Sequence, residues 1–74
     1  MKIRLEKAKE LKDGRKGKVL AEILGLSEQH ISNIFNGKFE ATRPVALVLV
    51  SIKENITVND RKMQEWLKYY FEEE

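Results

Sequence analysis

One stretch near the middle of the sequence gathers the side chains best suited to specific polar contacts. It reads GLSEQHISNIFNGK and covers residues 25–38. At helical spacing, Ile31, Ile34 and Phe35 fall on one side of it and short polar residues fall on the other. Those polar residues are Glu28, Gln29, Ser32 and Asn33. A helical face of short polar side chains without lysine or arginine predicts a surface that binds a partner through hydrogen-bond geometry.

Other kinds of chemistry find little support in the sequence. His30 is the single histidine and the chain has no cysteine, so we expect no metal site, disulfide or thiolate nucleophile. Carboxylates are plentiful, but no pair lies in the apolar context that tunes a general acid or base, and there is no glycine-rich phosphate loop. We therefore expect neither enzymatic activity nor a cofactor.

Charge is distributed unevenly along the chain. Residues 1–18 hold eight lysines and arginines against three acidic residues, whereas residues 59–74 hold three against five. A basic half that faces a polyanion has this composition, and so does a solvated lysine-rich helix. The longest apolar run, Val45–Val50, has six residues, whereas a membrane-spanning helix needs about 20. With no apolar leader in residues 1–10, we expect a cytoplasmic protein without a membrane segment.

The elements that position the polar face are expected to be helices almost throughout. Hydrophobic periodicity predicts an all-α bundle of about five helices in a single domain, residues 1–74. The helices are expected at residues 2–12, 16–24, 28–36, 44–54 and 59–73. Asp13-Gly14, Gly25 and Gly37 are stop signals, and Ser27, Thr42 and either Asn59 or Asp60 are N-cap candidates. The β-branched residues of 44–54 also suit a buried strand, but no partner strand is evident.

Two of these helices are expected to form a helix-turn-helix pair. In the second helix, Val19, Leu20, Ile23 and Leu24 recur at helical spacing. The small Ala21 suits a close helix crossing, and Gly25 begins a short turn. Leu20–Gly37, LAEILGLSEQHISNIFNG, resembles the helix-turn-helix of the phage-repressor family, the Cro-like and lambda-repressor-like domains. The resemblance rests on Ala21, Gly25, Ser27, Ile31, Ile34 and Gly37 in register. It covers the core, residues 16–37, extends loosely to the first and fourth helices, and does not reach residues 55–74.

The resemblance implies a sequence-specific regulator that binds double-stranded DNA with its third helix in the major groove. By position in the family's motif, the base-contacting residues are Glu28, Gln29, His30, Ser32 and Asn33. Gln29 and Asn33 are amides of the kind that pair with adenine N6 and N7. The implied phosphate contacts are Lys16, Lys18, Ser27, Asn36, Lys38 and Arg43.

Two positions depart from the family pattern. Glu28 stands where a glutamine is more usual. Its carboxylate could accept from cytosine N4, repel unsuitable sequences through their phosphates, or stabilise the helix N-terminus. Lys16-Gly17 replaces the common Thr-Gln pair that opens the second helix. The glycine suggests a close backbone approach or a fraying helix end.

The apolar residues of the C-terminal half allow two arrangements. Helix 59–73 carries an apolar stripe and helix 44–54 is apolar nearly all round. The residues concerned are Val48, Ile52, Met63, Trp66, Leu67, Tyr70 and Phe71. They suit either packing within the chain or a homodimer interface, and a dimer would bind a palindromic operator as Cro-like repressors do. The alternative functions are an antitoxin, whose C-terminal helix grips a protein partner through Trp66, Tyr70 and Phe71, and a module for protein contact alone.

Overall fold

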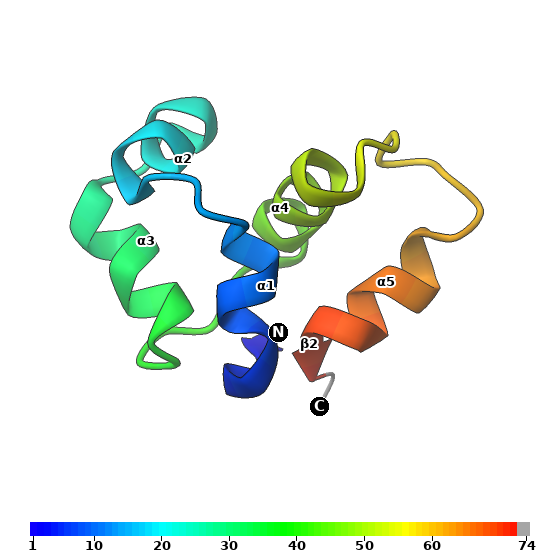
Figure 1. The fold of residues 1–74 in the computed structure, drawn as a ribbon, viewed down its shortest axis with the longest axis horizontal. Helices are drawn as coiled ribbons and strands as arrows, with labels where there is room; N and C mark the ends of the chain where they lie inside the picture. The colour runs from blue at the N-terminus through cyan, green and yellow to red at the C-terminus, as the bar shows by residue number, and fades with distance from the viewer. Residues whose placement is uncertain (73–74) are drawn as a thin grey trace.

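The computed structural model describes residues 1–72 as a mostly helical fold, with 61% of residues in helix (Figure 1). Within those residues it has five α-helices, which confirms the predicted all-α bundle of about five helices. They are α1 (Ala8–Lys12), α2 (Gly17–Leu24), α3 (Glu28–Phe35), α4 (Arg43–Glu54) and α5 (Met63–Tyr70). None of them is long and apolar enough to cross a membrane.

The three middle helices follow the predicted bounds to within one residue, because their end signals act locally. The Ser27 hydroxyl accepts a hydrogen bond from the His30 amide at 3.0 Å and caps α3. Thr42 accepts from the Val45 amide at 3.4 Å and caps α4. Gly25 ends α2 in the left-handed conformation, with φ of 69°. Residues 44–54 are helical, so the strand alternative is wrong.

The first predicted helix, residues 2–12, is wrong in its first half. Residues Lys2–Ile3 form strand β1, Leu5–Lys7 form a single 3-10 turn (η1), and only then does α1 begin. Strand β1 pairs antiparallel with β2 (Phe71–Glu72), so that Ile3 lies opposite Phe71. This pairing joins the two ends of the described chain, and a local helical pattern carries no signal for it.

The last predicted helix, residues 59–73, is also shorter in the structure. α5 spans Met63–Tyr70, and β2 follows it directly. Asp60 does act as a cap, but for the preceding turn: its Oδ1 accepts from the Lys62 amide at 2.8 Å. The predicted end at residue 73 lies outside the described residues.

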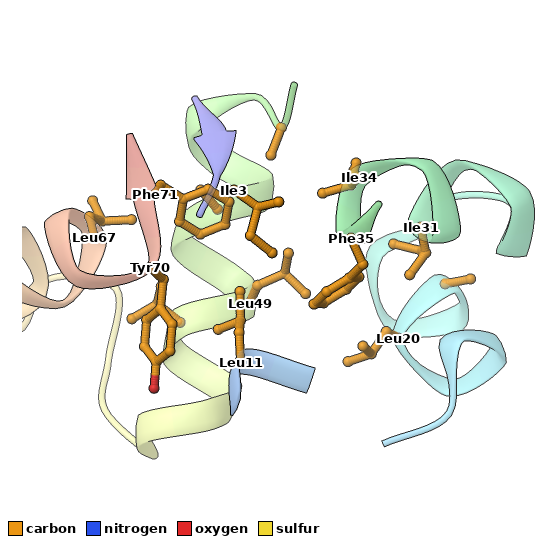
Figure 2. Close-up of a cluster of buried hydrophobic side chains, with 14 of the residues drawn as sticks. Ile3, Leu11, Leu20, Ile31, Ile34, Phe35, Leu49, Leu67, Tyr70 and Phe71 are labelled. Atoms are coloured by element: carbon orange, nitrogen blue, oxygen red, sulfur yellow. The ribbon is translucent and has the colours of Figure 1, made fainter. Parts of the chain in front are cut away.

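A single cluster of buried hydrophobic side chains joins the elements (Figure 2). Phe35 of α3 lies between Leu20 of α2 and Leu49 of α4, while Ile3 and Phe71 sit side by side on the paired strands. Ile31, Ile34 and Phe35 are all buried, as the helical pattern predicts.

The apolar stripe assigned to the second helix needs a correction. Leu20 is buried, with 2% of its surface exposed, and Leu24 packs partly against the core. Val19 and Ile23, however, are 46% and 56% exposed. An eight-residue helix that packs mainly on α3 buries only one edge, and the other two positions fall outside it.

Candidate nucleic-acid interface

The site is built on α2 and α3, which are joined by a turn of three residues, Gly25–Ser27. The left-handed Gly25 reverses the chain, and the Leu26 amide donates to the Ala21 carbonyl at 2.9 Å. Ala21 is buried with 5% of its surface exposed, and Ile31 with 1%. A small residue at this crossing lets the two helices approach closely, so α3 is held by its inner side and its outer side stays open.

The outer side of α3 carries the polar residues predicted from the sequence. Glu28, Gln29, Ser32 and Asn36 are exposed, and Asn33 is half-buried. The Gln29 side-chain Nε2 donates to Asn33 Oδ1 at 3.2 Å. Asn36 Nδ2 donates to the Ser32 hydroxyl at 3.4 Å. These bonds run along one helix between neighbouring turns. Within residues 1–72, the four side chains therefore bond to one another and to no other element.

His30 and Phe39 form a pair at one edge of this face. The half-buried His30 ring lies 5.5 Å, centroid to centroid, from the ring of Phe39, at an interplanar angle of 50°. Phe39 is 47% exposed, and its amide donates to the Asn33 carbonyl at 3.2 Å. Phe39 was not predicted as a site residue from the sequence. The sequence feature that could have indicated it is an aromatic residue between two charged residues, Lys38 and Glu40, in the loop after α3.

Exposed cations flank the pair of helices. Lys16 is the N-cap residue of α2, Lys18 lies in its first turn, and Lys38 follows α3. Arg43 begins α4. Within residues 1–72, none of these four side chains makes an ion pair, whereas Arg15 pairs with Asp13 at 3.2 Å. Ser27 and Asn36 are the other two predicted phosphate contacts. The Ser27 oxygen accepts the capping bond of α3, and its hydroxyl proton can still be donated to a phosphate.

Glu28 and Gly17 lie together where the first turns of α2 and α3 meet. A Cβ placed on Gly17 would lie 3.8 Å from Glu28 Cγ and 3.9 Å from Ile31 Cγ2, which is ordinary contact. The missing methyl therefore points toward α3 and not toward solvent. Gly17 is the first residue of α2, whose first turn is closed by the Val19 and Leu20 amides donating to the Lys16 carbonyl at 3.0 and 3.2 Å.

The C-terminal residues predicted for packing or dimerisation are mostly in the core of the chain itself. Met63 is 3% exposed, and Leu67, Tyr70 and Phe71 are each 0% exposed. Val48, Ile52 and Trp66 are partly exposed. A partner could not reach Tyr70 or Phe71 without unfolding the chain. Of the three residues expected to bind a protein partner in an antitoxin, only Trp66 is therefore accessible.

The polar atoms of α5 belong to a network that spans several elements. The Tyr70 hydroxyl donates to Glu54 Oε2 of α4 at 2.6 Å. Tyr69 donates to Glu10 Oε1 of α1 at 3.0 Å and accepts from Lys7 Nζ at 2.9 Å. Burial, followed by the hydrogen bond to Glu54, raises the pKa of Tyr70 above its usual range. The hydrogen bond to Tyr69 raises the pKa of Lys7. This network fastens α5 to the rest of the fold.

Comparison of the chain with protein-family models, with curated proteins and with solved structures finds no match. Within residues 1–72, no group of three or more histidine, cysteine, aspartate or glutamate side chains is placed to hold a metal ion. The open face of α3, with cations around it, is the arrangement from which a function can be argued.

Proposed function

We propose that this chain is a sequence-specific transcription regulator that binds double-stranded DNA by laying α3 in the major groove, in the manner of the phage-repressor domains it resembles. The observation that carries the proposal is the hydrogen bonding of the outer face of α3. Within residues 1–72, the side chains of Gln29, Asn33, Ser32 and Asn36 hydrogen-bond only along their own helix. Each of them keeps donors or acceptors for another molecule, because an amide has two donors and an acceptor with two lone pairs.

The shape of this face suits the groove. The B-DNA major groove is about 12 Å wide and admits one α-helix. Short side chains let the helix axis come close to the base edges, where Gln29 and Asn33 can pair with adenine N6 and N7. Their mutual 3.2 Å bond links the two side chains before DNA arrives, which lowers the ordering cost of binding.

Phosphates are assigned to the flanking cations. Lys16 and Lys18 stand at the start of α2, and Lys38 and Arg43 stand on either side of the loop after α3. Free of ion pairs within residues 1–72, they lose no internal partner when they meet DNA. The module for protein contact alone gives these cations no role.

A homodimer on a palindromic operator belongs to the proposal. A single α3 reads few base pairs, and repressors of this kind bind two half-sites one helical turn apart. Met63, Leu67, Tyr70 and Phe71 lie in the core, so the predicted interface residues left for a second copy are Val48, Ile52 and Trp66. Sedimentation of the free protein and of its complex with operator DNA tests this part. A protein that is monomeric in both states would contradict it.

The proposal is tested by selecting bound sequences from a random pool of duplex DNA and measuring affinity by fluorescence anisotropy. We expect a defined half-site and a log–log salt slope of about one unit per phosphate contact. Asn33→Ala and Gln29→Ala should each weaken operator binding by about 1–3 kcal/mol and leave binding to random duplex nearly unchanged. Gln64→Ala is the matched control, an exposed amide on α5 at the far end of the molecule. Selection that enriches no sequence would overturn the proposal.

A further inference from the structure

Phe39 is an exposed aromatic residue that lies outside the buried hydrophobic cluster. It is 47% exposed, and its ring meets His30 at the edge of the polar face of α3. Its backbone is fixed, because the amides of Lys38 and Phe39 donate to the Asn33 carbonyl at 2.9 and 3.2 Å. The backbone of Phe39 is therefore held against the Asn33 carbonyl of α3, and its ring lies against His30.

The position of the ring follows from the geometry of α3. His30 and Asn33 are neighbours three residues apart on the helix surface, and the Phe39 ring rests on His30. The ring thus extends the outer face of α3 on its His30–Asn33 side. Lys38, the preceding residue, is exposed and free to meet a phosphate at the same edge.

The chemistry of the major groove offers one partner for such a ring. The base edges there present hydrogen-bond donors and acceptors, and their only apolar group is the C5-methyl of thymine. We propose that Phe39 is a specificity-determining residue that contacts a thymine methyl at the edge of the half-site read by α3, with His30 positioning its ring. This inference rests on the proposed DNA binding and adds to it an apolar contact from outside the helix.

The test uses deoxyuridine, which lacks this methyl. Each thymine of the selected operator is replaced in turn by deoxyuridine, and affinity for the 74-residue chain is measured by fluorescence anisotropy. With the wild-type protein, we expect one thymine per half-site at which the replacement weakens binding about fourfold, the worth of burying one methyl-sized group. With Phe39→Ala, the thymine and deoxyuridine operators should bind equally at that position.

Two further variants make the result specific. Val58 is an apolar residue of similar exposure, 43%, in the loop between α4 and α5, and Val58→Ala should keep the wild-type profile. His30→Ala should reduce the discrimination at the same thymine, because it removes the ring on which Phe39 rests. Circular dichroism serves as the control that each variant is folded.

The outcomes distinguish a failure of the Phe39–thymine contact from a failure of the proposed DNA binding. If the wild-type protein selects no DNA sequence, the proposed function fails and this contact fails with it. If a sequence is selected but the Phe39→Ala and wild-type proteins show the same deoxyuridine profile at every position, DNA binding stands and the thymine contact is overturned.

Discussion

Helices α3 and α5 are both eight residues long and amphipathic, and they lie toward opposite ends of the molecule (Figure 1). They differ in what their polar side chains do. Those of α3 bond along the helix itself, Gln29 to Asn33 and Ser32 to Asn36. Those of α5 bond to α1 and α4, through Tyr69 and Tyr70. The fold uses the polar groups of α5 and leaves those of α3 open, so changes on α5 should affect stability and changes on α3 should affect binding.

The largest effect is expected from removing an aromatic ring of α5. Tyr70 is 0% exposed and belongs to the same buried cluster as Leu11 and Leu49. Tyr70→Ala should lower the free energy of unfolding by about 3–5 kcal/mol, the cost of deleting a large buried side chain. Urea denaturation followed by circular dichroism measures it. A midpoint near that of the wild-type protein would show that α5 does not hold the fold together.

Removing only the hydroxyl group of Tyr70 should lower the free energy of unfolding by less, and by an amount that depends on pH. Tyr70→Phe removes the 2.6 Å bond to Glu54 and should cost about 1–3 kcal/mol at neutral pH. The folded protein holds the pKa of Tyr70 above its ordinary value of 10.0. The unfolded chain therefore loses this proton first, and the stabilisation, complete below pH 10, declines as pH rises beyond it. Unfolding measured from pH 8 to 11 should show a steeper alkaline loss in the wild-type protein than in Tyr70→Phe.

Sequence patterns predict the α3 end of the molecule better than the α5 end, for a physical reason. α3 is defined by neighbours in sequence: Ser27 caps it, and Ile31 and Ile34 give its inner side. The ends of the chain are defined by a distant pairing, because Ile3 of β1 lies opposite Phe71 of β2. No periodicity within residues 2–12 reveals that partner. The Tyr69–Glu10 and Tyr70–Glu54 bonds are hidden from the sequence in the same way.

The candidate site shows a similar division. The polar face, Gln29 to Asn36, follows from the spacing of residues in one helix. Phe39 lies beyond the helix, and its place against His30 depends on how the loop folds back. The exposure of Val19 and Ile23 depends on which edge of α2 meets α3, and periodicity alone does not distinguish that edge from its neighbour.

The end of α3 offers a matched pair of glycines for the next prediction. Gly37, which follows α3, has φ of 77°, and an added Cβ would lie 3.0 Å from Leu5 Cδ2. Gly14 has φ of 72° and open space around it. Both alanine variants should lose about 1–2 kcal/mol to left-handed backbone strain. Gly37→Ala should lose slightly more, because Leu5 must shift. Urea denaturation of both proteins checks this, and equal losses would show that the exposed Leu5 side chain moves freely.

The smallest effect is expected at Gly17, the first residue of α2. Here a substitution should raise the free energy of unfolding, whereas the Tyr70 variants should lower it. Gly17 has helical backbone geometry, and an added methyl would make ordinary contacts with Glu28 and Ile31. Gly17→Ala should therefore raise the free energy of unfolding by about 0.5–1 kcal/mol, because alanine loses less backbone entropy on folding. Since the methyl points toward α3, affinity for the selected operator should stay unchanged. A more stable variant that binds this DNA more weakly would mean that a phosphate approaches the first turn of α2 closely enough to exclude a side chain there.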